Sequence, residues 1–255
     1  MNWTGKTVLI TGASSGIGEA LAVEFGRRGA AVALAARRVE VLREVAGKVE
    51  AAGGRALAFA VDVRDAGEMR AAVAQVVERF GPVNVLVANA GKGELTLARE
   101  FDIEVVTEVL SVNLLGALNS VAAVLPGMLE RGAGQIVGIS SLAAYRGFPG
   151  SGAYCASKAA LSTFFESLRV ELRTANIYVT TIHPGFIDTP MTRNRNQKMP
   201  FLQDAEPAAR LMLRAIEAKR RTYAFPWQLA TIARLGRWLP AALYDRMLSK
   251  ATLRE

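Results

Sequence analysis

Short apolar runs alternate with longer segments of helical periodicity along most of the chain. The runs are rich in Val, Ile and Ala and do not alternate with polar residues, which is typical of parallel strands covered on both faces. They predict buried strands at Thr7–Ile10, Ala31–Ala35, Ala56–Val61, Val83–Ala88, Gln135–Ile139 and Ile177–Ile182, with a seventh strand at Thr222–Phe225. The intervening segments predict helices near 16–28, 39–52, 66–80, 102–130 and 153–175.

This alternation of strands and helices predicts βαβ units with right-handed crossovers. The expected fold class is α/β, with a doubly wound parallel sheet of about seven strands and helices on both faces. The chain has 255 residues and no internal repeat or linker, so a single domain is expected. Two segments fall outside the rhythm: residues 189–206, which are polar, and the tail 226–255, which is rich in Trp, Leu and Arg.

The chain contains one cysteine, Cys155, and one histidine, His183. A single cysteine excludes an intrachain disulfide, and a zinc site needs three or four such ligands, so no metal is expected. His183 would be the only base available to a Ser-His-Asp hydrolase, and no G-x-S-x-G turn supports that reading. We interpret His183 as a structural residue at a strand end and Cys155 as a small packing residue.

The formal net charge of +8 is concentrated near the C-terminus. Residues 207–255 hold ten Lys and Arg against three Asp and Glu, a local excess of +7. No helix-turn-helix or base-stacking motif accompanies it, so no nucleic-acid partner is expected. We expect no signal peptide at the N-terminus, and since no uncharged apolar run reaches about 18 residues, we expect no spanning helix.

A glycine-rich turn follows the first predicted strand and opens the first predicted helix, with the sequence TGASSGIG at 11–18. Glycines let the backbone turn tightly and approach a pyrophosphate, and the helix N-terminus presents free N–H groups to it. The spacing G-x3-G-x-G differs from the common dinucleotide fingerprint, and the alternative is a simple tight turn. Its position after the first strand favours a dinucleotide site.

The end of the second predicted strand carries Arg37 and Arg38 and no carboxylate. An NAD enzyme needs an acidic residue here for the ribose 2′-hydroxyl, whereas arginine suits a 2′-phosphate. The expected cofactor is therefore NADP(H), with Arg37 as its main contact and Arg38 as a second one. The alternative is a solvated helix start.

Tyr154 and Lys158 lie four residues apart at the start of a predicted helix, so they share one face. An ammonium group beside a phenol stabilises the phenolate and lowers its pKa, which suits proton transfer to a carbonyl oxygen at neutral pH.

These segments resemble the short-chain dehydrogenase/reductase family in order and spacing, over nearly the whole chain to about residue 225. The resemblance rests on a set of motifs: TGASSGIG at 11–18, Asp62 after the third strand, ANAG at 88–91, Asn113, Ser141 thirteen residues before Tyr154, YCASK at 154–158 and HPGFIDT at 183–189. It implies a Rossmann-type fold, with residues 1–225 as the dinucleotide-binding and catalytic domain.

The resemblance also implies catalytic roles for four residues. Tyr154 would be the general acid in reduction, and Lys158 would lower its pKa and hold the nicotinamide ribose. Ser141 would hydrogen-bond the substrate oxygen, with Ser140 as a competitor. Asn113 would hold a water that relays protons from Lys158.

The cofactor-binding residues implied in the same way lie at the ends of the predicted strands. They are Gly12, Ser14, Ser15, Gly16, Ile17, Gly18, Arg37, Arg38, Asp62, Val63, Asn89, Ala90, Gly91, Tyr154, Lys158, Pro184, Gly185, Ile187 and Thr189. The sequence departs from the family at Ala88, where Asn is frequent, and at Ser15, where many NADP-using relatives carry a basic residue.

Residues 189–206 lie where the family has its substrate lid. Met191, Met199, Phe201 and Leu202 could line an apolar pocket, and Arg193, Arg195 and Lys198 could meet an anionic group. The alternative is a solvated loop.

The tail 226–255 extends past the resemblance and predicts an amphipathic helical extension. At 100° per residue one arc holds Leu229, Ile232, Leu235 and Leu239, and the other holds Thr231, Arg234 and Arg237 near Trp227 and Trp238. Such a helix can lie in a membrane interface, and the alternative is packing against its own domain or a partner subunit.

The function expected from these observations is hydride transfer between NADP(H) and a carbonyl or secondary alcohol, on an apolar substrate such as a lipid-like or steroid-like ketone. The alternatives are a regulatory cofactor-binding protein and a membrane-surface binding protein on the same fold. A homo-oligomer, dimer or tetramer, is expected from the family. The expected location is the cytoplasm, or a peripheral position at the inner face of a membrane.

Overall fold

The fold is built on one sheet of seven parallel strands. The computed structural model describes residues 3–193 and 198–252, and the strand order in the sheet is β3-β2-β1-β4-β5-β6-β9. Its strands are β1 (Thr7–Thr11), β2 (Ala31–Ala36), β3 (Arg55–Ala60), β4 (Val83–Ala88), β5 (Gly134–Ile139), β6 (Ile177–Pro184) and β9 (Thr222–Phe225). Every pairing is parallel, so the predicted α/β class and all seven predicted strands are confirmed.

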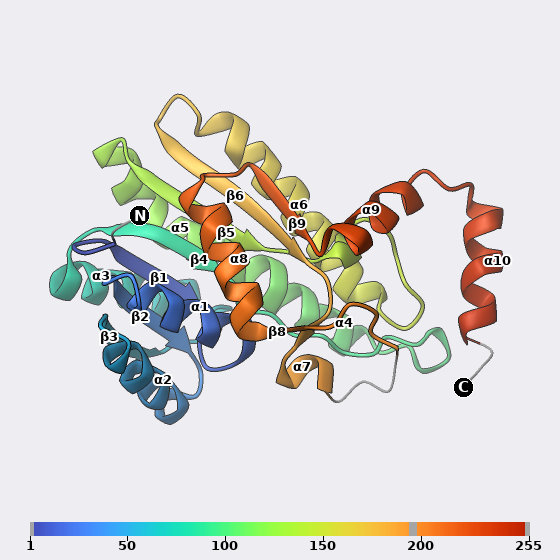
Figure 1. Cartoon of the computed structure of the whole chain (residues 1–255), viewed down its shortest axis with the longest axis horizontal. Coiled ribbons are helices and arrows are strands. Elements are labelled where there is room, and N and C mark those ends of the chain that lie inside the picture. Colours follow the sequence, from blue (N-terminus) through green and yellow to red (C-terminus); the bar gives the residue numbers. More distant parts are fainter. Residues whose placement is uncertain (1–2, 194–197, 253–255) are drawn as a thin grey trace.

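Helices cover both faces of the sheet (Figure 1). One face carries α1 (Gly16–Gly26), α2 (Val39–Ala51) and α8 (Ala205–Glu217). The other face carries α3 (Ala66–Phe80), α5 (Gly116–Arg131) and α6 (Gly152–Glu171), and α4 (Ile103–Leu110) packs against α6.

Successive residues of β1 enter the two separate cores. Val8 and Ile10 pack with α1 and α8, whereas Leu9 packs with α3 and α6, and all three are fully buried. Because side chains alternate along a strand, a central strand buried on both faces must be apolar at every position. This requirement explains the unbroken apolar runs in the sequence.

The chain reverses its direction of winding beside β1. From β1 it proceeds outward through β2 and β3, and it then returns to the other side of β1 to form β4, β5, β6 and β9. The loops after β1 and β4 therefore diverge at the carboxyl ends of the strands. In open α/β sheets such a switch point is where ligands bind.

The long predicted helix over 102–130 is interrupted. The segment Ser111–Leu115 forms a π-helical turn between α4 and α5, and Asn113 is completely buried within it. Single π turns inside α-helices often occur at functional sites, because the extra residue redirects a side chain.

Helix α8 was not among the predicted helices. Its buried Ala208, Ala209, Met212 and Leu213 recur with helical spacing and pack against α1. The segment expected to form a lid, 189–206, contains the short helix α7 (Pro190–Arg193) and β8 (Gln203–Asp204), and its last two residues open α8. Strand β8 pairs with β7 (Ile187–Asp188) in a small second sheet.

One helical run is long and apolar enough, by length and composition, to cross a membrane: Ile103–Arg131. This corrects the expectation that no such run exists. Its side chains Val121, Val124 and Met128 belong to the core that also holds side chains of α3 and α6, and Val109 is fully buried, so the run serves here as a core element of the domain.

The tail forms two helices, α9 (Trp227–Gly236) and α10 (Ala241–Thr252). They follow β9: α9 packs against β9 and the turn after β5, and α10 lies at the end of the molecule (Figure 1). The described residues also contain two short 3-10 turns, Ala98–Glu100 and Leu142–Ala144.

Candidate active site

A cleft of about 390 Å³ opens at the carboxyl ends of the central strands. It is lined by nearly every residue that the sequence places at the site: Gly12, Ser14, Ser15, Gly16, Ile17, Arg37, Arg38, Asp62, Val63, Asn89, Ala90, Gly91, Ser141, Tyr154, Lys158, Pro184, Gly185, Ile187 and Thr189. The sequence motifs, which span more than 170 residues of chain, therefore converge on one place.

The glycine-rich turn lies in close contact with the loop after β4. Gly12 has a φ of 66°, and a Cβ there would lie 2.7 Å from the Cα of Ala90. Gly16 has a φ of 59°, and a Cβ there would lie 2.9 Å from Cγ2 of Thr189. Both positions require glycine for conformation and for space. The turn thus keeps its backbone open to the cleft at the N-terminus of α1, where a phosphate is favoured.

Gly18 has a different place from the other two motif glycines. It does not line the cleft but packs behind the turn, where a Cβ would lie 2.3 Å from the carbonyl oxygen of Gly12. Its role in the structure is to let α1 approach the turn. The side chain of Asn89 fixes the same turn, because its Nδ2 donates to the carbonyl oxygens of Thr11 and Gly12 at 3.0 and 3.2 Å.

Arg37 and Arg38 follow β2 at the edge of the cleft, and both are exposed. Nη2 of Arg38 donates to Oγ of Ser14 at 3.0 Å, which joins this edge to the glycine-rich turn. The pKa values of Asp62 and Glu108 are lowered chiefly by hydrogen bonds from Arg64 and Lys92, and the positive charge of Arg37 adds a small contribution to both. This corner of the cleft therefore combines two exposed guanidinium groups with the N-terminal end of α1.

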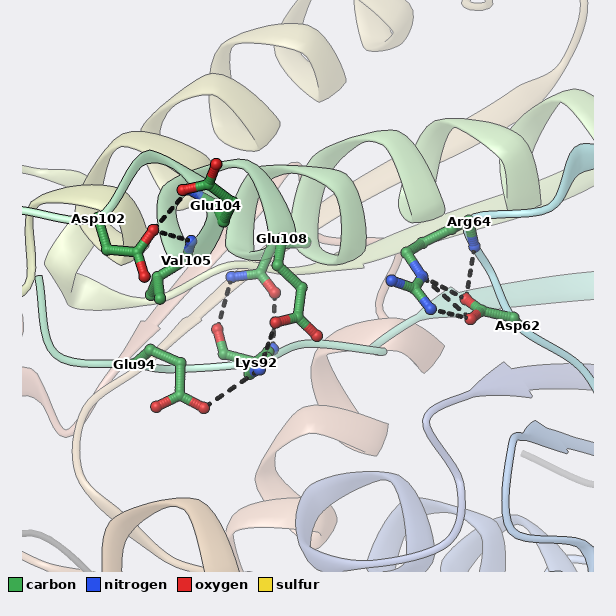
Figure 2. A network of polar contacts seen from close by, with 9 residues as sticks. Asp62, Arg64, Lys92, Glu94, Asp102, Glu104, Val105 and Glu108 are labelled. Carbon is green, nitrogen blue, oxygen red and sulfur yellow. Dashed lines mark hydrogen bonds and ion pairs between the residues drawn. The ribbon is translucent and has the colours of Figure 1, made fainter.

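Asp62 lies after β3 and is held by Arg64 (Figure 2). The Nε atom of Arg64 lies 3.0 Å from both carboxylate oxygens. This hydrogen bonding holds the pKa of Asp62 below its ordinary value. The carboxylate is thus ionised and fixed in orientation at the rim where the resemblance places the adenine.

Tyr154 and Lys158 lie on the first turns of α6, which begins at Gly152. Nζ of Lys158 lies 5.8 Å from the centre of the Tyr154 ring and donates to the carbonyl oxygen of Ile139 at 2.8 Å. Burial away from water disfavours the charged ammonium and lowers the pKa of Lys158 to about 8.

Ser141 caps the 3-10 turn that follows β5. Its Oγ accepts a hydrogen bond from the main-chain N–H of Ala143 at 3.1 Å and lines the cleft. Ser140, the competing serine, also touches the cleft, but its Oγ donates to the carbonyl oxygen of Lys158 at 3.0 Å. Of the two hydroxyls, that of Ser141 is the better placed for a substrate.

Asn113 lies behind the cleft lining. Its Oδ1 accepts from the main-chain N–H of Lys92 at 2.7 Å, and its Nδ2 donates to the Lys92 carbonyl and to Oγ of Ser157, both at 2.9 Å. The side chain therefore joins the π turn to the loop after β4 and to α6. A Cβ on Gly91 would lie 3.4 Å from Nζ of Lys158 and 3.5 Å from Oδ1 of Asn113, so Gly91 separates these two groups.

The far wall of the cleft is the loop after β6, with Pro184, Gly185, Ile187 and Thr189. The N–H of Gly185 donates to the carbonyl oxygen of Phe225 at 2.7 Å. A Cβ on Gly185 would lie 3.1 Å from Cδ1 of Leu229, so the start of the tail packs directly against this loop.

Some cleft residues were not predicted from the sequence. Lys92 lies between Glu94 and Glu108, at 3.3 and 2.7 Å, as Figure 2 shows. The position of Lys92, directly after the ANAG motif, was the available signal. Ala36, Val61, Val112, Ile139, Pro190 and Thr192 also line the cleft.

The segment predicted to form a substrate lid contributes some residues to the cleft wall. Met191 lines the cleft, and Phe201 and Leu202 are exposed beside β8. Arg193 pairs with Asp188 at 2.7 Å instead of meeting the cleft, and Arg195 lies outside the described residues.

His183 and Cys155 are both buried, as their interpretation as structural residues requires. The ring nitrogens of His183 lie 3.2 Å from Oγ of Ser162 and 3.4 Å from Oγ1 of Thr222. Burial disfavours the imidazolium and lowers the pKa of His183 to about 4. Among the described residues, no cluster of His, Cys, Asp and Glu has the composition of a metal site.

Comparison with known proteins identifies the family to which the chain belongs. Residues 6–200 match the short chain dehydrogenase family. The chain is 42% identical over 240 residues to an uncharacterized oxidoreductase of Myxococcus xanthus (strain DK1622), covering 94% of this chain and 95% of that protein. It is 34% identical to a ketoacyl reductase of Nostoc sp. (strain PCC 7120), with 85% of this chain and 77% of the relative covered. The solved structure of levodione reductase superposes with a TM-score of 0.84 at 26% identity, covering 90% of this chain and 99% of that one.

The chain therefore belongs to the short-chain dehydrogenase/reductase family. It is an oxidoreductase that binds a nicotinamide cofactor and transfers hydride at CH–OH and C=O groups.

Proposed function

We propose that the protein is an NADP(H)-dependent reductase of a carbonyl group, working in the reverse direction as a dehydrogenase of a secondary alcohol. The observation that carries the proposal is the convergence of Ser141, Tyr154 and Lys158 on a cleft whose edge at β2 holds Arg37 and Arg38. Strands β1 and β4 separate β2 from β5. With adjacent strands about 4.8 Å apart, the two groups of residues stand about 14 Å apart, a span that suits an extended dinucleotide.

The two arginines support NADP(H) as the cofactor. The turn formed by Gly12 and Gly16 would hold the pyrophosphate, and the Arg37 guanidinium would meet the 2′-phosphate of the adenosine ribose. Arg38 would hold the same edge through its hydrogen bond to Ser14. A 2′-phosphate is a dianion that matches the fork of a guanidinium, whereas the bare hydroxyl of NAD would have no acidic partner here.

The residues around the nicotinamide end are suited to proton transfer. The cofactor, when bound, supplies the hydride. Ser141 and Tyr154 would donate hydrogen bonds to the carbonyl oxygen, which stabilises the negative charge that develops on it. Tyr154 would then pass its proton to that oxygen, and the Lys158 ammonium would stabilise the resulting phenolate.

A chain of fixed contacts supports the position of Lys158. Its Nζ is tied to Ile139 and its main-chain oxygen to Ser140, on the segment that leads into Ser141. These bonds fix Lys158 to the segment that leads into Ser141, and Lys158 shares the first turns of α6 with Tyr154, which is the preorganisation that such chemistry needs. A purely regulatory cofactor-binding protein would not require this arrangement.

The substrate that we propose is an apolar ketone of the lipid-like or steroid-like kind. Met191 lies in the cleft wall, and Phe201 and Leu202 are exposed on the adjoining segment. Apolar and flexible side chains of this kind favour substrates with a hydrocarbon body. The similarity to a ketoacyl reductase agrees with this substrate class.

We also propose a homo-oligomer in the cytoplasm. Leu115 at the end of the π turn and Phe164 on α6 are large apolar side chains that are exposed to solvent. Both lie among the helices that cover the same face of the sheet as α5 and α6. Such exposed apolar positions are typical of subunit interfaces. Light scattering of the purified chain tests the oligomer, with a monomer at working concentration as the contradicting result.

The proposed activity is tested by NADPH consumption against a panel of carbonyl compounds, from small ketones and aldehydes to steroid and long-chain keto-lipids. We expect turnover with apolar ketones, and greater turnover with NADPH than with NADH. NADPH binding without turnover of any panel member, in the presence and absence of lipid vesicles, would favour the regulatory alternative.

A further inference from the structure

Helix α9 exposes its large apolar side chains and buries small ones. Trp238 just after the helix is 85% exposed, and Trp227, Leu235 and Ile232 are 72%, 66% and 63% exposed. The side that faces the domain carries the buried Ala230. A helix that only packs on its own domain does the opposite, so this outer face is unpartnered in the single chain.

The loop after Ser141 fixes this helix in place through Arg146. Its Nη1 donates to the carbonyl oxygens of Gly236 and Leu239, the latter at 2.8 Å, at the C-terminal end of α9. The guanidinium also lies 3.8 Å from the centre of the Tyr244 ring on α10, and the Tyr244 hydroxyl donates to the carbonyl oxygen of Gly147 at 2.6 Å. The positive charge of an arginine at a helix C-terminus interacts favourably with the helix dipole, and its N–H groups bind the last carbonyl oxygens. The contact therefore holds α9 to the loop at a defined position.

A third segment, residues 95–97, lies on the other side of the loop that carries Arg146 and adds to the apolar surface. Thr96 pairs with Ser151 and its N–H donates to the carbonyl oxygen of Gly150 at 2.9 Å. Leu95 and Leu97 flank Thr96 beside Gly150, and Phe148 is exposed on the loop itself. All three segments lie at the end of the molecule that carries α9 and α10 (Figure 1). We define the C-terminal apolar face as the exposed residues of these segments: Leu95, Leu97, Phe148, Trp227, Ile232, Leu235, Trp238, Leu243 and Met247.

This face borders the substrate side of the cleft. Helix α9 packs against the 3-10 turn Leu142–Ala144, which Ser141 caps, and Leu229 packs against Gly185 in the opposite cleft wall. The two walls that flank the reactive groups are therefore both attached to the element that carries the exposed tryptophans.

The charges beside the face indicate what covers it. Arg234 and Arg237 are exposed on α9 and the turn after it, and Arg246 is exposed on α10. Within residues 218–252 the sequence has one acidic residue, Asp245, against seven Lys and Arg. A second copy docked face to face would bring like charges together, which is unfavourable. Anionic lipid headgroups would complement the arginines, and tryptophan favours the boundary between headgroups and acyl chains.

We propose that the C-terminal apolar face docks on the surface of an anionic lipid bilayer. Resting on the proposed function, the inference extends to the substrate: the cleft receives a carbonyl compound that is dissolved in that bilayer. Trp227, Trp238, Leu235 and Ile232 insert at the interface, and the arginines meet the headgroups.

Vesicle flotation of the full chain tests the docking directly. Two vesicle types are compared: phosphatidylcholine alone, and phosphatidylcholine with about a third phosphatidylglycerol. We expect strong binding to the anionic vesicles and weak binding to the neutral ones. Trp227→Ser combined with Leu235→Ser and Trp238→Ser should weaken binding to anionic vesicles by about tenfold or more. Arg234→Gln with Arg237→Gln should remove the preference for anionic lipid.

A matched control uses apolar residues exposed elsewhere. Val170→Ser with Leu129→Ser changes exposed positions on α6 and α5 and should leave flotation unchanged. Equal flotation of the triple serine variant and the unmodified chain would overturn the proposal. A dimer in light scattering that the triple variant dissociates, with no binding to vesicles, would overturn it in favour of a second copy as the occupant.

The reductase activity is followed separately, so that the two proposals fail independently. On a water-soluble ketone without vesicles, the triple variant should turn over at the rate of the unmodified chain, since none of its changed residues lies in the cleft. On a bilayer-dissolved ketone, it should be about tenfold slower at low vesicle concentration. Vesicle binding without any reductase activity would contradict the proposed function and leave the docking intact. Equal rates for both proteins on the bilayer-dissolved ketone would overturn its delivery from the membrane.

Discussion

The ammonium nitrogen of Lys158 lies 2.8 Å from the carbonyl oxygen of Ile139, the last residue of β5. Two residues further along the chain is Ser141, and one helical turn before Lys158 is Tyr154. This buried hydrogen bond ties the strand that leads into the serine to the helix that carries the tyrosine, and the bond from Oγ of Ser140 to the Lys158 carbonyl oxygen adds a second connection. The geometry of the reactive groups depends on these bonds and on the charge of Lys158.

The titration of Lys158 should appear in the pH profile of reduction. Burial lowers the pKa of Lys158 to about 8, so the ammonium is present below that pH and is lost as the pH rises through it. Because the charged form stabilises the Tyr154 phenolate, kcat/KM for carbonyl reduction should fall above about pH 8. Arginine remains charged throughout this pH range. The kcat/KM of Lys158→Arg should therefore show no such decline above pH 8, even if its absolute value is lower than that of the unmodified enzyme. A flat profile from pH 7 to 10 in the unmodified enzyme would contradict this role of the lysine.

Arg37→Ala should change the choice of cofactor. Removal of a charge-assisted hydrogen bond to a phosphate costs about 1.5–3 kcal/mol, so the Kd for NADPH should rise about 10- to 150-fold. The Kd for NADH should change little, because it lacks the 2′-phosphate. Fluorescence titration with both cofactors measures the ratio. Arg43→Ala, at an exposed ion pair with Glu40 one turn into α2, is the control and should affect neither. Equal losses for NADPH and NADH would argue against a phosphate contact.

Two glycine substitutions in helices should have opposite effects on stability. At Gly18 a Cβ would lie 2.3 Å from the carbonyl oxygen of Gly12, so Gly18→Ala should destabilise the fold by about 1–3 kcal/mol and weaken cofactor binding. At Gly47 in α2 a Cβ meets no described atom within 4 Å, so Gly47→Ala should stabilise by about 0.5–1 kcal/mol. Chemical denaturation measures both, and the same sign for both changes would rule out the steric explanation.

His183 should make the stability sensitive to acid. Burial lowers its pKa to about 4 in the folded state against 6.5 when unfolded, so the unfolded chain binds more protons between these values. The free energy of unfolding should therefore fall by about 3 kcal/mol as the pH drops from 6.5 to 4. In His183→Gln this part of the decline should be absent, although its stability at neutral pH is lower. Identical slopes for the two proteins between pH 6.5 and 4 would contradict a buried neutral histidine.

The strands and the cleft residues could be predicted because both depend on local sequence. A strand buried on both faces has to be apolar throughout, and the turns after the strands carry the motif residues. The π turn at Ser111–Leu115 could not be predicted, since its sequence continues an ordinary helical pattern and tertiary contacts of Asn113 with Lys92 and Ser157 accompany the change in winding. These contacts join residues that are 21 and 44 positions apart.

The orientation of α9 is a second feature that the local sequence could not predict. The periodicity of the tail predicts a helix but does not predict which side faces the domain. In the structure Ala230 is buried, Leu229 packs against Gly185 and Trp227 is exposed, an orientation set by contacts with the loop after β6. The carbonyl acceptors of Arg146 at the end of this helix are likewise set by tertiary packing.

The most direct measurement of the central claim is NADPH oxidation by Tyr154→Phe with the best ketone of the panel. Phenylalanine keeps the ring that faces Lys158 but removes the hydroxyl that donates the proton. We predict that NADPH binds with nearly unchanged Kd while kcat falls by about 10²- to 10⁴-fold, the contribution expected of general acid catalysis. Turnover by Tyr154→Phe at the rate of the unmodified enzyme would contradict the account.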